Sequence, residues 1–158
     1  MTTSSSMNCR SLTPGEVELA RSVFADAIDY SKVRLFRGKW WPFHPRRAAM
    51  APMGDIWFHP DGGGWAADFS KEPLGQQAFF IHEMTHVWQA QRHGRFYLML
   101  MRHPFCRYVY RLQAGKPFAG YGIEQQAEIV RHRFLADRGF PVTIVPPADL
   151  LPFGNSDI

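Results

Sequence analysis

The sequence predicts a single α+β domain, because three segments have the periodicity of helices and two shorter segments have that of strands. Its length of 158 residues is about that of one domain, and a hydrophobic content of 46% is enough to build a core. We find no internal repeat and no second-domain boundary. We expect a disordered N-terminal segment at residues 1–11, one folded domain at 12–139, and an extended, Pro-rich tail packed on it at 140–158.

The first helix is predicted to begin after Thr13 and to continue to about Tyr30. Thr13 is a capping residue, Pro14 occupies the first helical position, and Glu16 lies three residues after the cap. Apolar residues then recur at spacings of three and four and give the helix one apolar face. They are Val17, Ala20, Val23, Phe24, Ala27 and Ile28.

Two short strands are predicted at residues 32–36 and 55–59, and together they would form a small sheet. Apolar and charged side chains alternate in the first, and a Pro- and Gly-rich turn ends the second. Residues 37–53, between them, mix Gly and Pro with Trp and Phe, which predicts an ordered aromatic loop. The apolar run at 96–101 is predicted to be a buried helical turn or strand.

Two further helices are predicted at residues 76–93 and 122–138. The first contains no Gly or Pro and is followed by Gly94, and the second is followed by Gly139. Glycine directly after a periodic segment is typical of a helix end. We expect the sheet to pack on the helix at 76–93 and the last helix to cross it.

The helix at 76–93 contains the HExxH motif, His82-Glu83-Met84-Thr85-His86. Residues four apart share one helix face, about 6 Å apart along the axis, so both imidazoles can face one ion. Glu83 is rotated away from both and would lie beside the open position of the metal. The flanking residues are largely apolar, and burying two imidazoles and a carboxylate is costly unless something binds them. The motif therefore predicts a zinc site.

A catalytic zinc site usually has three protein ligands, so a third must be found. The metzincin extension requires Gly at position 89 and His at 92, where this chain has Gln89 and Arg92, so that class is excluded. His93 lies about 10 Å along the axis from His86 and would reach the ion only if the helix broke. Glu124, in the last helix, is the favoured third ligand, and Glu128 is the main alternative.

Glu124 and Glu128 lie one turn apart on one helix face, as the corresponding acids do in thermolysin-like gluzincins. In those enzymes the first carboxylate binds zinc, and the second orients a zinc-binding histidine. By this likeness Glu128 would orient a zinc-binding histidine, and a plain solvated pair of carboxylates is the remaining alternative. His132, one turn further on, lines the same cleft or lies at the surface.

Composition argues against several other classes of protein. Lys and Arg number 18 against 14 Asp and Glu, a net charge of +4, and no recognisable nucleic-acid module accompanies it, so we expect a solvated basic face and no nucleic-acid partner. Cys9 and Cys106 could form at most one bridge, and we interpret both as thiols in a reducing compartment. Neither a signal peptide nor a membrane-spanning run of ~18 apolar residues is found, so we expect a cytoplasmic protein in the producing cell.

Four segments carry a resemblance to a known family: residues 24–34, 54–58 and 81–89, and the Tyr-x-x-Glu-Gln-Gln-Ala pattern at 121–127. They resemble the metallopeptidase-like core domain associated with contractile injection systems, and most closely the Vgr-related proteins linked to bacterial type VI secretion. The resemblance covers roughly residues 12–139. The aromatic loop at Trp40 to Phe43 departs from the wider family, and this affects the surface for substrate or partner.

The resemblance implies a zincin-like, gluzincin-type fold, hydrolysis of peptide bonds, and a link to the secretion machinery, through which the protein could be delivered without a signal peptide. His82, His86 and Glu124 would hold the zinc, and Glu83 would accept a proton from water and pass it to the leaving amine. The donor to the oxyanion stays open among Tyr121, Tyr97 and His132. The alternative is a non-catalytic, zinc-stabilised interaction module that docks on a component of the secretion spike.

Overall fold

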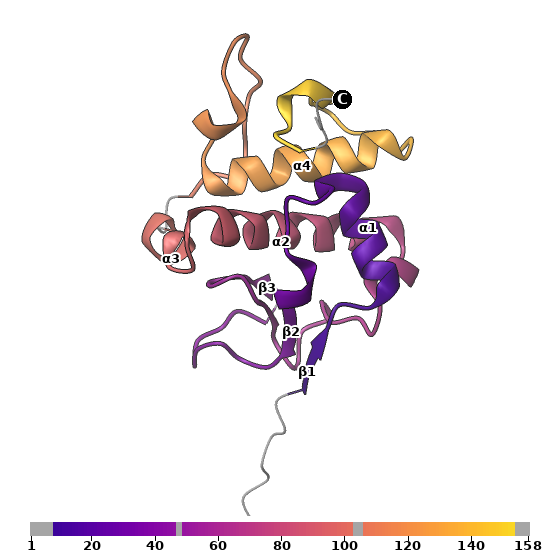
Figure 1. The fold of residues 1–158 in the computed structure, drawn as a ribbon, viewed down its shortest axis with the longest axis vertical. Coiled ribbons are helices and arrows are strands. Elements are labelled where there is room, and N and C mark those ends of the chain that lie inside the picture. Colours follow the sequence, from indigo (N-terminus) through magenta and orange to yellow (C-terminus); the bar gives the residue numbers. More distant parts are fainter. Residues whose placement is uncertain (1–7, 47–48, 103–105, 154–158) are drawn as a thin grey trace, which may run out of the picture.

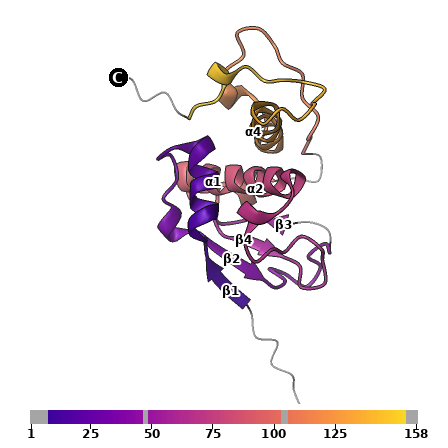
Figure 2. The same ribbon diagram turned by 90° about the vertical axis from the view of Figure 1, so that its right-hand side faces the viewer.

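The computed structural model describes residues 8–46, 49–102 and 106–153, which form three layers (Figures 1 and 2). A small sheet forms the first layer, the long helix α2 lies on it, and α4 covers the opposite side of α2. The elements are β1 (Asn8–Ser11), α1 (Pro14–Phe24), β2 (Arg34–Arg37), β3 (Ala49–Met50), β4 (Ile56–Phe58), α2 (Leu74–His93), α3 (Tyr97–Met101) and α4 (Ile123–Asp137). The predicted small α+β domain is confirmed.

The sheet has four strands in the order β1-β2-β4-β3. β1 and β3 are antiparallel to their neighbours, and the central pair β2 and β4 is parallel, with Leu35 opposite Ile56. The rings of Phe58, Phe69 and Phe80 follow one another at centroid distances of 5.4 and 5.1 Å. This stack of rings joins β4 to α2 and fixes the helix on the sheet.

Helix α2 is buried on all sides from Phe80 to Ala90. The sheet packs on one side of it and α4 on the other, so polar side chains from several faces of the helix lie inside the protein. A helix enclosed in this way needs no amphipathic pattern. It ends at Gly94, whose φ of +99° favours glycine.

The first helix is shorter than predicted. α1 ends at Phe24, and Ala25 adopts a positive φ of 47°. The Tyr30 hydroxyl donates to the Ala25 carbonyl at 2.6 Å, and the Asp29 carboxylate accepts from the Ser31 amide at 3.2 Å. These hydrogen bonds stabilise a turn in place of further helix. Ile28 and Tyr30 are still buried in the core, whereas Ala27 is exposed.

Three other sequence predictions need correction. Residues 8–11, predicted to be disordered, form the edge strand β1, because the adjacent edge of β2 is available to pair with them; residues 1–7 lie outside the described part. Residues 49–50 of the predicted aromatic loop pair with β4 as β3. The run at 96–101 contains the short helix α3, in which only Leu98 is buried, so most of this apolar turn is exposed.

The C-terminal segment lies on the helices as far as it is described. Its Phe153 ring is buried, with centroids 4.8 Å from Phe24 and 5.0 Å from Trp88. Within the described residues, no helix combines the length and hydropathy needed to cross a membrane.

A buried carboxylate joins the N-terminal strand to the rest of the domain. Glu16 is fully buried and accepts from both terminal nitrogens of Arg10, at 2.7 and 2.8 Å. It also accepts from the backbone amides of Thr13 and Phe69, each at 2.9 Å. One side chain therefore links β1, α1 and the turn that precedes α2.

We expect Glu16→Ala to lower the free energy of unfolding by about 3–5 kcal/mol, because it leaves a guanidinium and two amides without their acceptor. Chemical denaturation measures this change. The control is Glu18→Ala, which removes an exposed carboxylate from the same helix and should change stability by less than about 0.5 kcal/mol. Equal effects of the two substitutions would contradict the role assigned to Glu16.

Candidate metal centre

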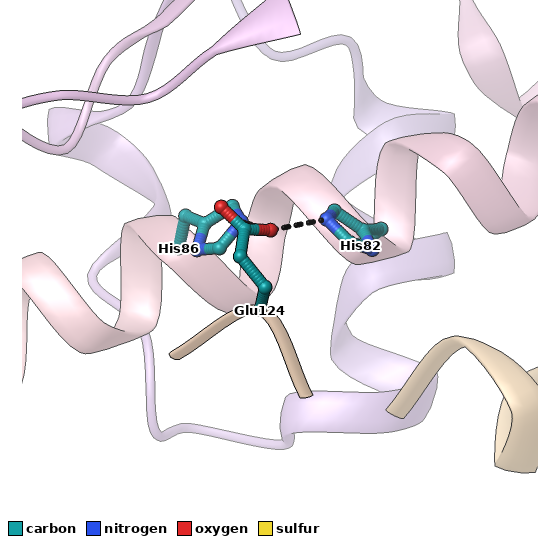
Figure 3. Close-up of side chains that lie close together, drawn as sticks. All are labelled: His82, His86 and Glu124. Atoms are coloured by element: carbon teal, nitrogen blue, oxygen red, sulfur yellow. Dashed lines mark hydrogen bonds and ion pairs between the residues drawn. The ribbon is translucent and has the colours of Figure 1, made fainter. Parts of the chain in front are cut away.

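Three side chains from two helices converge on one point (Figure 3). The Nε2 atoms of His82 and His86, one turn apart on α2, lie 3.3 and 3.1 Å from the Oε2 atom of Glu124 on α4. The exposed fractions of the three residues are 7%, 4% and 2%. The packing of α4 across α2 thus brings together residues that are 38 to 42 positions apart in the chain.

The geometry of this cluster fits a metal ion. One ligand atom from each residue lies within 4.8 Å of the other two. Atoms that bind one zinc ion tetrahedrally at about 2.0–2.1 Å are about 3.3 Å from one another, which agrees with both measured separations. Two imidazoles and one carboxylate are also ligands that zinc prefers.

The second nitrogen of each histidine ring has its own oxygen partner. Nδ1 of His82 lies 2.8 Å from Oε1 of Glu128, and Nδ1 of His86 lies 2.8 Å from Oε1 of Gln89. When Nδ1 donates its proton to such an oxygen, the Nε2 atom of a neutral imidazole carries a lone pair. Both lone pairs then face Glu124, an arrangement that needs a shared cation or proton.

The same contacts between imidazoles and carboxylates shift the pKa values of the metal-free cluster. Burial alone would lower the pKa of His82, but hydrogen bonds to Glu124 and Glu128 outweigh it and raise this pKa to about 9. Burial would raise the pKa of Glu124, but the two histidines and Arg102 lower it strongly. A proton on His82 therefore compensates the buried carboxylate where no metal is bound.

A pocket of about 450 Å³ opens over this cluster. Glu83 lines it beside His82 and Glu124, and it is itself 95% buried, with an exposed fraction of 5%. Glu83 is not part of the three-residue cluster. Glu83 thus lies at the wall of the pocket next to a candidate ligand, and its place beside the open position of a metal stays a prediction.

Two further residues near the site belong to no sequence motif. Arg102 lies at the end of α3 and lines the same pocket, and its Nη2 atom is 3.2 Å from the Oε1 atom of Glu124. The Tyr108 ring is stacked over His82 at a centroid distance of 6.3 Å and also lines the pocket. Burial raises the pKa of the Tyr108 hydroxyl. Both residues lie in irregular or short segments, where no periodicity could indicate them.

The three candidates for the oxyanion donor are not among the residues lining this pocket. The hydroxyl of Tyr121 accepts from the backbone amide of Gln113 at 3.2 Å. His132 lies 2.6 Å from the Tyr110 hydroxyl and lines an adjoining pocket of about 190 Å³. Tyr97 packs against His93, with ring centroids 4.4 Å apart, beyond the far end of the motif.

Comparisons with known proteins assign this fold to a class of proteins. The solved structure of the effector domain of Pseudomonas aeruginosa VgrG2b matches with a TM-score of 0.71 and 42% identity, over 82% of this chain and 75% of that one. The type VI secretion system spike protein VgrG2b of Pseudomonas aeruginosa is 45% identical over an alignment of 138 residues, and the match covers 83% of this chain. No protein-family model matches. The class is therefore that of α+β effector domains related to type VI secretion spike proteins.

The chain belongs to the family of the VgrG2b effector domain. It spans 13% of the length of the complete VgrG2b spike protein. The predicted link to Vgr-related proteins of type VI secretion is thereby confirmed.

Proposed function

We propose that this chain is a zinc-dependent peptidase domain of a type VI secretion effector. The observation that carries the proposal is the convergence of His82, His86 and Glu124 beneath a pocket that Glu83 also lines. A site that only stabilises the fold usually fills all four zinc positions with protein ligands. Here two of the three candidate ligands, His82 and Glu124, and the adjacent carboxylate of Glu83 line an accessible pocket, which favours chemistry.

The residues would have the following roles in the reaction. When bound, zinc would polarise the scissile carbonyl and lower the pKa of a water molecule. Glu83 would accept the proton of the attacking water and return it to the leaving amine. Arg102, which pairs with Oε1 of Glu124, would keep Oε2 turned toward the two histidines. Glu128 would hold the His82 ring through Nδ1.

Tyr108 is the better candidate for the oxyanion donor. It lines the pocket and is stacked over His82, whereas Tyr121, His132 and Tyr97 do not line this pocket. A phenol at the pocket wall has a proton to donate to the oxygen on which negative charge develops.

The relatives suggest the setting in which such an activity would act. One is named as a type VI secretion spike protein and the other as an effector domain. By this likeness, the chain would be delivered by a secretion system, with a spike component as its partner and a peptide or protein as its substrate. A non-catalytic, zinc-stabilised module that docks on the spike is the competing function.

We expect the purified protein to contain one zinc per chain and to cleave peptides in a library of mixed sequence. Elemental analysis after purification without chelator measures the metal, and mass spectrometry of the library measures cleavage. Less than about a tenth of an equivalent, with no uptake of added zinc, would contradict the metal site. Bound zinc without cleavage of any peptide would favour the docking module.

A further inference from the structure

Two buried glutamines continue the hydrogen bonds of the candidate metal centre away from the pocket. Gln89 lies on α2, three residues after His86, and is fully buried. Gln126 lies on α4, two residues after Glu124, and is 94% buried, with an exposed fraction of 6%. Neither residue lines the pocket, so neither has a direct part in the chemistry proposed above.

The backbone determines which way the Gln126 amide points. Its Nε2 donates to the carbonyl of Tyr121 at 2.8 Å, and a carbonyl can only accept. The other end of the amide, Oε1, therefore faces Gln89. The reverse orientation would place two oxygens against each other and is excluded by the same contact.

The orientation of the Gln89 side-chain amide is determined in the same way. Its Nε2 donates to the carbonyl of Ile123 at 3.0 Å and to Oε1 of Gln126 at 2.9 Å, so both of its hydrogens are used. Its oxygen is left facing Nδ1 of His86 at 2.8 Å. An amide oxygen can only accept, so Nδ1 carries the proton. In the neutral ring, Nε2 is then free of hydrogen and faces Glu124.

We propose that Gln89 and Gln126 are positioning residues that hold His86 in its Nδ1-protonated tautomer and so prepare Nε2 to bind the metal. This inference rests on the proposed zinc site. This chain of hydrogen bonds, the relay, begins at the backbone carbonyls of Tyr121 and Ile123, which lie three residues and one residue before Glu124. The segment that positions Glu124 therefore also determines the tautomer of His86. Packing of α4 on α2 brings both residues into place together.

The two histidines are held differently. His82 is oriented by the carboxylate of Glu128, which also pairs with Arg131 at the edge of the pocket. His86 is oriented by a neutral amide that is fully enclosed. The orientation of His86 is thus determined by packing and is isolated from solvent, and the relay can be tested apart from the pocket.

The test uses Gln89→Met, which keeps an unbranched side chain of similar size but removes the acceptor. We expect the dissociation constant for zinc, measured by chelator competition, to rise by about 10- to 100-fold. In the metal-free protein, ¹⁵N NMR of the His86 ring should show the Nδ1-protonated tautomer in wild type and a mixture in the variant. Gln126→Met, which removes the contact that orients Gln89, should shift both measurements in the same direction.

The matched control is Gln77→Met, on the same helix. Gln77 donates to the carbonyls of Ser70 and Glu72, at 3.3 and 2.8 Å, and does not contact either histidine. It should lower stability while leaving zinc affinity within about twofold of wild type. Lower stability in the Gln89 and Gln126 variants, with unchanged zinc affinity and unchanged tautomer, would overturn the relay. Because the tautomer is read without metal and the affinity without substrate, failure of the relay is distinguishable from failure of the peptidase.

Discussion

Glu83→Gln is expected to reduce peptide hydrolysis by ~100-fold or more, because it removes the proposed proton acceptor beside the proposed metal position. The substitution preserves the size of a side chain whose exposed fraction is only 5% and which lines the pocket next to His82 and Glu124. Glu83 is outside the three-residue cluster, so zinc content and melting temperature should stay close to those of wild type. Initial rates on the best peptide of the library give the measurement.

The control for this experiment is Glu18→Gln, which neutralises an exposed carboxylate on α1 and should leave the rate unchanged. If Glu83→Gln cleaves as fast as wild type, the activity belongs to a contaminant or to a different base. If the variant loses its zinc as well, Glu83 contributes to binding the metal and the assignment of roles changes.

The parts of the site that could be predicted depend on helix geometry. His82 and His86 share a face because they are four residues apart in an unbroken helix, and this relation is local. Glu124 and Glu128 are likewise related by one turn of α4. Their approach to the histidines is not local, but it follows once two helices with buried polar faces must pack on each other. The structure brings all four side chains together, with Glu128 against Nδ1 of His82.

The parts that could not be predicted depend on irregular backbone or on rotamers. Arg102 and Tyr108 reach the pocket from segments without periodicity. Tyr121 lies one residue before the cap of α4, and its hydroxyl turns to the backbone of the preceding loop. Strand β1 has no alternating pattern and is held by Arg10 through the buried Glu16. In each case a side-chain contact between two segments decides the position, and neither periodicity nor composition indicates such a contact.

Removal of zinc is expected to lower the melting temperature by about 8–16 °C. A ligand present at 1,000 times its dissociation constant stabilises the folded state by about 4 kcal/mol, and one kcal/mol corresponds to about 2–4 °C in a domain of this size. The increment should be large here because the candidate ligands come from α2 and α4, so a bound ion would join two layers of the fold. Differential scanning calorimetry with and without chelator measures the difference.

Glu124→Ala should lose most of this zinc-dependent increment, since it removes the candidate ligand that α4 contributes to the cluster. His93→Ala is the matched control: this histidine is exposed, in the last turn of α2, and packs against Tyr97 away from the cluster. It should retain the full increment. The comparison uses the difference between metal-loaded and chelated protein for each variant, so a general loss of stability cancels. Retention of the increment by Glu124→Ala together with its loss in His93→Ala would make His93 the third ligand, and α2 would then have to break before Gly94 to let it reach the ion.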